Sequence, residues 1–233
     1  MATISEKLRT TQDRIDAAVQ AVGRSAGSVQ LLTVSKTFPA EAVREAHAAG
    51  ARAFGENYVQ EGLEKISALA DLRADLEWHL IGPLQSNKTR PVAEAFDWVH
   101  SVDRLKTAAR LSEQRPPELP PLNICLQVNI SGEASKGGVA PAELAALAHQ
   151  VAALPRLRLR GLMAVPEPAA DFDAQRLPHR ALAELFVALN AEGLALDTLS
   201  MGMSADLEAA IAEGATMVRV GSAIFGSRTR SPV

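Results

Sequence analysis

The sequence has little of several features that mark particular classes of protein. Cys125 is the only cysteine, so no disulfide can form within the chain, and a reducing cytoplasm is the expected compartment. No apolar run approaches the ~20 residues that a membrane-spanning helix needs. The 24 basic and 27 acidic residues give a net charge of −3, and no basic block occurs. Nucleic acid and anionic membranes are therefore not expected as main partners.

The chain is also poor in aromatic residues, at 4%, and Tyr58 is its only tyrosine. Its first residues lack the apolar core of a signal or transit peptide and include the acidic Glu6 and Asp13. They predict instead an amphipathic helix with one apolar stripe. The stripe consists of Ile4, Leu8, Ile15, Val19 and Val22.

Apolar segments of strand length, by contrast, are abundant, and they alternate with helical patterns. Eight segments have the pattern of buried strands: Leu31–Lys36, Arg52–Tyr58, Glu77–Gly82, Trp98–Val102, Asn123–Ile130, Leu157–Val165, Thr198–Met203 and Thr216–Gly226. The segments expected to be helical are Pro39–Ala49, Val59–Leu72, Lys88–Ala95, Asp103–Glu113, Pro141–Leu154, Asp173–Ala191 and Ala205–Glu213. Such alternation with short connections indicates parallel βαβ units.

Parallel βαβ units can form a closed barrel or an open doubly wound sheet. The count of eight strands and the chain length of 233 residues, close to the ~250 of typical barrels, favour the barrel. The lack of a GxGxxG turn after the first strand favours it too. We therefore expect an α/β fold, a (β/α)8 TIM barrel with an extra N-terminal helix, as a single domain over residues 1–233.

The first predicted strand, LLTVSK, ends in a lysine. Because side chains alternate along a strand, Leu32, Val34 and Lys36 share one face, which puts an ammonium at the end of an apolar row. Burial lowers the pKa of a lysine, and the neutral amine is a nucleophile. The alternative is an ordinary lysine whose ammonium extends to water. This segment alone leaves both interpretations open.

In barrels of this kind the functional residues lie at the carboxyl ends of the strands, and the last two loops commonly hold a phosphate. The residues at these ends are Lys36, Asn57, His79, Ser101, Asn129, Met163, Ser200 and Arg219. The last two strands continue into Met203-Ser204 and Gly221-Ser222, where small residues and hydroxyls can present donors to a phosphate. Alternatively, Ser204 is an ordinary helix N-cap and Gly221 a turn glycine.

Arg219 stands between Val218 and Val220, whose side chains should face the outer helices, so Arg219 is expected to point into the barrel. It stays protonated and needs a partner, which could be an acid from another strand or a ligand atom. His79 could tie down the nearby loop at residues 85–88 or take part in a site. The remaining histidines lack metal-ligand spacing and are expected at the surface. They are His47, His100, His149 and His179.

Several segments together resemble one known family. They are TVSK, FGENYVQE, WHLIGPLQSNK, VNIS with SKGG, RGLM, LSMGMSADLEAAI and VRVGSAIFG. These match the pyridoxal phosphate homeostasis proteins over about residues 31–226, and that family resembles the barrel domain of alanine racemase standing alone. The segment Pro166 to Pro178 matches none of its motifs.

The resemblance implies that pyridoxal 5′-phosphate (PLP) is held as a covalent imine on Lys36. It implies that Arg219 faces the pyridine nitrogen of PLP and that Asn57 and His79 lie near the ring. The residues expected around the phosphate are Ser200, Met203, Ser204, Gly221 and Ser222. Lys136, in the SKGG loop, is expected to be a weaker substitute for Lys36.

We expect a PLP carrier in vitamin B6 homeostasis without substantial amino-acid turnover, and with no metal. Racemisation on the resembled scaffold uses a lysine on one face of PLP and a tyrosine from a second domain on the other. Tyr58 should point away from the face of Asn57 and cannot serve. The alternatives are a PLP-dependent racemase or decarboxylase and, without PLP, an aldolase that forms an imine with a phosphorylated sugar. We expect a monomer that makes transient contacts with PLP-accepting enzymes.

Overall fold

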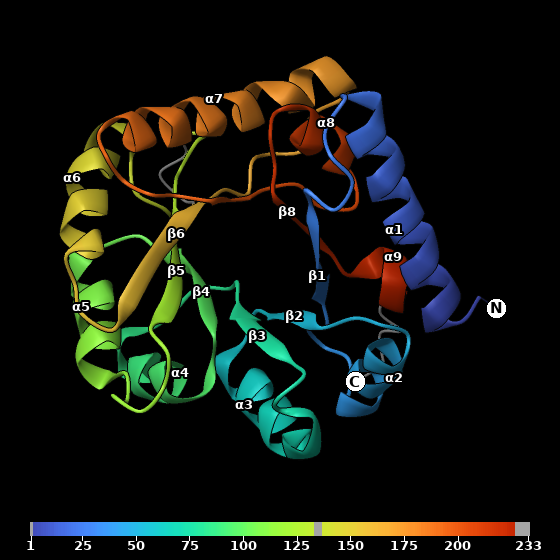
Figure 1. Ribbon diagram of the computed structural model, residues 1–233, viewed down its shortest axis with the longest axis horizontal. Coiled ribbons are helices and arrows are strands. Elements are labelled where there is room, and N and C mark those ends of the chain that lie inside the picture. The colour runs from blue at the N-terminus through green and yellow to red at the C-terminus, as the bar shows by residue number, and fades with distance from the viewer. Residues whose placement is uncertain (1, 133–136, 227–233) are drawn as a thin grey trace, which may run out of the picture.

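The computed structural model describes residues 2–132 and 137–226. Eight parallel strands form a closed barrel in chain order, and the last strand pairs with the first (Figure 1). The strands are β1 (Gln30–Val34), β2 (Ala53–Glu56), β3 (Glu77–Leu80), β4 (Trp98–Val102), β5 (Leu122–Gln127), β6 (Leu157–Met163), β7 (Thr198–Ser200) and β8 (Met217–Val220). The structure confirms the predicted (β/α)8 TIM barrel.

The α-helices surround the barrel on the outside (Figure 1). They are α1 (Ile4–Ala21), α2 (Ala40–Ala48), α3 (Val59–Ala68), α4 (Thr89–Ala95), α5 (Leu105–Gln114), α6 (Pro141–Ala152), α7 (Phe172–Ala191), α8 (Leu207–Ala212) and α9 (Ser222–Phe225), with short 3₁₀ turns at Ala70–Leu72 and Ser86–Lys88. The helix expected over Val59–Leu72 is therefore interrupted, and its last turn is a separate 3₁₀ turn. Among the described residues no helix is both long and apolar enough to span a membrane.

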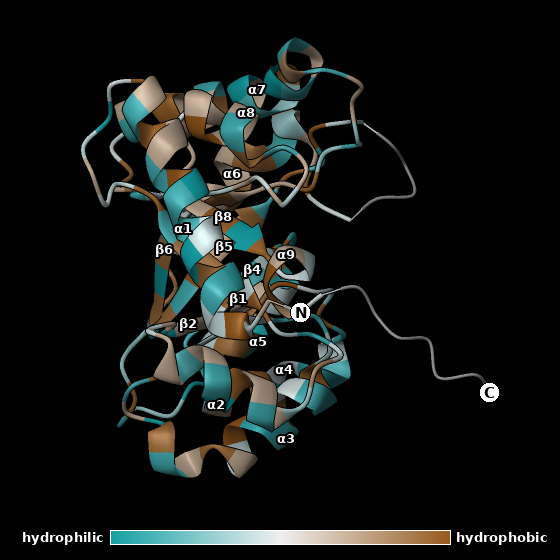
Figure 2. Cartoon of the chain, turned by 90° about the vertical axis from the view of Figure 1, so that its right-hand side faces the viewer, coloured by the Kyte–Doolittle hydropathy of each residue, from teal (hydrophilic) through white to brown (hydrophobic). Residues whose placement is uncertain are grey.

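The extra N-terminal helix, α1, supports the loop that follows β7. It begins with a capping box, in which Thr3 and Glu6 each accept the other's backbone N–H. Leu8, Ile15 and Val19 of its apolar stripe are buried, Ile4 is half-buried, and Val22 is 42% exposed because it lies at the C-cap. In Figure 2, where α1 faces the viewer, the helix carries both hydrophilic and hydrophobic residues. Arg14 donates to the Ser204 carbonyl (2.8 Å) and also pairs with the Glu208 carboxylate on α8.

The prediction of one strand over Thr216–Gly226 is wrong at its carboxyl end. Strand β8 stops at Val220, and the chain turns into the one-turn helix α9. A Cβ at Gly221 would lie 2.8 Å from the Val34 carbonyl oxygen, so the chain passes close to β1 at this turn. The following apolar residues resemble a strand, but Ile224 is buried and Phe225 stacks on Phe38 with ring centroids 5.1 Å apart.

Candidate functional site

A cavity of about 570 Å³ opens at the carboxyl ends of the strands. Seven of the nine predicted site residues line it: Lys36, Asn57, Met203, Ser204, Arg219, Gly221 and Ser222. The other two, His79 and Ser200, do not line it, since both are completely buried. We refer to this space as the rim cavity.

Lys36 reaches the rim cavity from a turn and not from a strand. Strand β1 ends at Val34, two residues earlier than predicted, and Lys36 is half-buried in the connection to α2. Thr37 follows it with a φ of 67°, in the left-handed region that β-branched residues rarely adopt. The backbone around Lys36 is therefore held in an unusual conformation.

Arg219 points into the barrel, as the alternation along its strand predicts. Its Nη1 donates to the Ser200 carbonyl (2.6 Å) and hydroxyl (2.9 Å), and its Nη2 donates to the Ala164 carbonyl (2.9 Å). Burial lowers the pKa of Arg219 to about 10, against the opposing influence of Asp206, so the side chain remains a cation at neutral pH. These bonds use three of its five N–H groups, and the guanidinium also borders the rim cavity.

Behind Arg219, a line of hydrogen-bonded side chains crosses the barrel interior. His100 lies 2.9 Å from the Ser200 hydroxyl through Nδ1 and 2.9 Å from His79 Nδ1 through Nε2. His79 Nε2 lies 2.8 Å from a Glu77 carboxylate oxygen. The alternative role of His79, which was to tie down the loop at residues 85–88, is therefore wrong, since both ring nitrogens have other partners. We refer to Glu77, His79, His100 and Ser200 as the interior array.

Charged groups lie at the two ends of the interior array, the Arg219 guanidinium beside Ser200 and the Glu77 carboxylate beside His79. Burial, with the charges of His79 and Arg219, lowers the pKa of His100 well below its usual value, so His100 is neutral. Burial opposes ionisation of Glu77, but its hydrogen bond to His79, the charge of His79 and further side-chain hydrogen bonds together outweigh burial and lower the pKa of Glu77. An ionised carboxylate can only accept hydrogen bonds, so His79 Nε2 donates to Glu77. Each of the four side chains has at least one hydrogen-bond partner within the array.

Two histidines expected at the surface are buried, so that part of the prediction is wrong. His100 lies inside the barrel beside Trp98, because alternate residues of β4 face inward. His179 on α7 is 1% exposed and lies 3.0 Å from a carboxylate oxygen of Asp206. The alternation in WVHSV is a sequence signal for the burial of His100. No local sequence pattern predicts the contact between His179 and Asp206.

The loop between β7 and α8 differs from the prediction in its hydrogen bonds. Helix α8 has Asp206 as its N-cap, so the alternative role of Ser204 as the N-cap is wrong. The Asp206 carboxylate accepts the Met203 N–H at 2.7 Å, so this donor is already used. Burial opposes ionisation of Asp206, but hydrogen bonds from His179 and Met203 outweigh it and lower its pKa. Ser204, Gly221 and Ser222 remain as donors beside the rim cavity.

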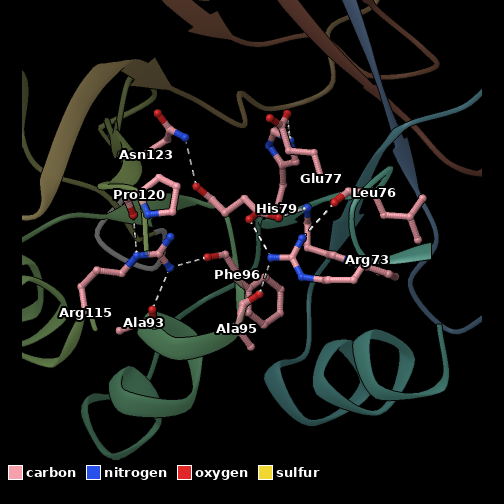
Figure 3. Close-up of polar contacts among 12 residues, drawn as sticks. Arg73, Leu76, Glu77, His79, Ala93, Ala95, Phe96, Arg115, Pro120 and Asn123 are labelled. Carbon is pink, nitrogen blue, oxygen red and sulfur yellow. Dashed lines mark hydrogen bonds and ion pairs between the residues drawn. The ribbon is translucent and has the colours of Figure 1, made fainter. Parts of the chain in front are cut away.

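At the opposite rim of the barrel, two arginines bind groups of the protein itself (Figure 3). Arg115 donates to the carbonyls of Ala93, Phe96 and Pro120, each at 2.8 Å. Arg73 binds the Asp97 carboxylate at 2.7 Å. These guanidinium groups are engaged by the protein itself, which is why we assign the functional site to the other rim.

Few groups near the rim cavity can perform acid–base or nucleophilic chemistry. Among the described lining residues, only Lys36 and Arg219 are titratable. Tyr58 is 58% exposed and does not line the cavity. Burial raises the pKa of the Cys125 thiol to about 12, so little nucleophilic thiolate forms at neutral pH. Among the described residues no group of three or more metal-ligating side chains could hold a metal ion.

The structure is a (β/α)8 barrel with a cavity at the carboxyl ends of its strands. Comparison with known sequences identifies the family to which this barrel belongs. The model of the family "Alanine racemase, N-terminal domain" matches residues 11–229. The pyridoxal phosphate homeostasis protein of Pseudomonas aeruginosa is 65% identical over 228 residues, covering 98% of this chain and 97% of the relative. That of Escherichia coli K12 is 56% identical over 232 residues, covering 99% of each. The chain belongs to the pyridoxal phosphate homeostasis protein family.

Solved structures agree with this assignment. PipY of Synechococcus elongatus, solved with PLP bound, is 40% identical with a TM-score of 0.84, over 96% of this chain and all of PipY. Alanine racemase from Corynebacterium glutamicum is 17% identical with a TM-score of 0.64. The similarity covers 95% of this chain and 62% of the racemase, and at this identity it shows the shared fold alone.

The first prediction concerns the interior array. Ser200→Ala removes one acceptor of Arg219 and the hydrogen-bond partner of the buried His100 Nδ1, so we expect the free energy of unfolding to fall by about 1–3 kcal/mol. Ser101→Ala is the matched control, since Ser101 is buried on β4 and its hydroxyl has no hydrogen-bond partner among the described residues. Urea unfolding of the cofactor-free protein measures both changes. Equal losses would contradict a stabilising role for the array.

Proposed function

We propose that this protein binds PLP in the rim cavity, holds it as an imine with Lys36, and carries it as cargo in PLP homeostasis. The observation that carries this proposal is that one cavity is lined by both a lysine amine and a buried arginine cation. A volume of about 570 Å³ lies within the range of small-molecule sites. The family assignment and the PLP-bound relative PipY support it.

The residues around the rim cavity fit PLP. The carboxamide oxygen of Asn57 is buried and has no hydrogen-bond partner among the described residues, so it can accept a bond from a ligand. Arg219 has N–H groups left after its three protein bonds and can donate one to the pyridine nitrogen. Ser204 and Ser222 supply hydroxyl groups for the phosphate. His79 and Ser200 would act through Arg219, since neither lines the cavity.

When bound, PLP supplies an aldehyde for the imine and, in enzymes, an electron sink. In this chain Lys36 supplies the amine. Because Arg219 stays cationic, it donates a hydrogen bond and disfavours protonation of the ring nitrogen, which weakens the electron sink. No second acid or base among the described lining residues stands ready to move a proton, so the site is suited to holding PLP and poorly suited to turning over amino acids.

Several parts of the sequence-based interpretation stay predictions. They are the monomeric state, the transient contacts with PLP-accepting enzymes, the cytoplasmic location and the extent of the single domain over residues 1–233. The suggested substitute lysine, Lys136, lies outside the described residues.

A second prediction concerns the phosphate. Two charge-assisted hydrogen bonds, at about 1.5–3 kcal/mol each, predict that PLP binds at least about a hundredfold more tightly than pyridoxal. Ser222→Ala should weaken PLP binding and leave pyridoxal binding unchanged, because only PLP carries the phosphate. Titrations followed by absorbance measure both affinities. Equal affinity of the wild-type protein for the two aldehydes would contradict the phosphate site.

A third prediction is that amino-acid turnover is slow or absent. General acid–base groups contribute about 10²–10⁴-fold each, so the missing partner to Lys36 should leave at most a trace activity. The PLP-loaded protein is incubated with L-alanine in D₂O, and Cα–H exchange and optical rotation are followed, with free PLP as the control. Turnover of about 1 s⁻¹ or more would overturn the carrier function and favour the racemase alternative.

A further inference from the structure

A buried ion cluster lies behind the turn that carries Lys36. It consists of Glu56 at the end of β2 and of Glu61 and Lys65 on α3. Glu56 is completely buried and Lys65 is 5% exposed. None of the three residues lines the rim cavity. The cluster is therefore placed to act on the turn and not on a ligand.

Lys65 is fully engaged in this ion cluster. Its ammonium lies 2.7 Å from a Glu56 carboxylate oxygen, 2.7 Å from a Glu61 carboxylate oxygen and 2.7 Å from the Ser35 carbonyl. A lysine ammonium has three N–H groups, so all of them have acceptors here. One of those acceptors belongs to the backbone of the residue before Lys36.

The ion cluster holds the chain on both sides of Lys36. On one side, the Ser35 hydroxyl donates to Glu56 while its carbonyl accepts from Lys65. On the other side, the Thr37 backbone N–H donates to the same Glu61 oxygen that binds Lys65. The residues before and after Lys36 are thus bonded to one network, while the Lys36 side chain lines the rim cavity.

The turn needs such support because its backbone is strained. Thr37 has a φ of 67°, and a residue in a sparsely populated region stays there only when its surroundings hold it. A buried ion cluster is a weak means of stabilising a fold, because apolar residues of similar volume often serve as well. The specific contribution of this cluster is its set of hydrogen bonds to Ser35 and Thr37.

We propose that Glu61 and Lys65 are positioning residues that direct the Lys36 amine into the rim cavity and thereby favour imine formation. This inference rests on the proposed function, since it assigns a role to groups that support Lys36. It predicts that loss of the cluster weakens the covalent part of PLP binding and spares the noncovalent part.

The test compares PLP with pyridoxine 5′-phosphate, which has an alcohol in place of the aldehyde and cannot form an imine. Glu61→Ala is the mild variant, since it leaves Glu56 and Lys65 as an ion pair and removes the one oxygen acceptor that the Thr37 N–H shares with Lys65. We expect it to weaken PLP binding about tenfold, the effect of losing one charge-assisted hydrogen bond. Binding of pyridoxine 5′-phosphate should change less than about twofold, because its contacts are intact.

Two further variants of α3 complete the design. Glu61→Gln keeps an oxygen acceptor and should retain most of the PLP affinity. Glu64→Ala is the matched control, because Glu64 is exposed on the same helix and, within the described part of the chain, its side chain bonds to Gln60 alone. It should change the binding of neither compound. Urea unfolding of each cofactor-free variant checks that the protein is folded.

The outcomes separate this inference from the proposed function. Unchanged PLP affinity in Glu61→Ala, or an equal loss for both compounds, would overturn the positioning role while the wild-type imine stands. A selective loss of PLP affinity that Glu61→Gln restores would support it. A wild-type protein that forms no borohydride-reducible imine with PLP would overturn the proposed function and this inference together.

Discussion

The burial of one cation, Arg219, organises the interior of this barrel. A guanidinium cannot give up its charge, so its burial requires acceptors, and it finds them in the carbonyls of Ala164 and Ser200 and the Ser200 hydroxyl. The interior array then links the Ser200 hydroxyl to the Glu77 carboxylate by hydrogen bonds across the barrel, and the Trp98 ring lies against both of its histidines. What remains of the guanidinium's donor capacity faces the rim cavity. The buried charge of Arg219 therefore determines both the hydrogen bonding inside the barrel and the positive charge beside the rim cavity.

The rim cavity combines a nucleophile with little machinery for proton transfer. Lys36 and Arg219 are the only titratable groups among its described lining residues, and Asn57 offers an unused acceptor. A site of this composition can fix a ligand by an imine, a hydrogen bond to the ring and a phosphate contact. None of the described lining residues other than Lys36 and Arg219 can take or give a proton. This composition supports the proposed storage and transfer of PLP more than it supports catalysis.

Local patterns predicted most of the fold and the identity of the rim residues. The alternation Val218-Arg219-Val220 correctly predicted that Arg219 points into the barrel. His100 was expected at the surface but is buried, and the alternation along its own strand agrees with that burial. The apolar run after Gly221 resembled a strand because periodicity cannot separate a short strand from one buried helical turn. The ion cluster was missed because Lys65 meets Ser35 across 30 residues, a contact that only the folded barrel creates. Tertiary contacts between charged groups leave no periodic signal in the sequence.

The central claim is that the Lys36 amine forms the bond to PLP, and borohydride reduction tests it most directly. The protein is loaded with PLP, reduced, digested and mapped by mass spectrometry, with Lys36→Ala as the control. The proposed function predicts that the pyridoxyl mass lies on the peptide that contains Lys36 and is largely lost in the control. A label found mainly on Lys88 or Lys136, or a control labelled as strongly as the wild-type protein, would contradict it.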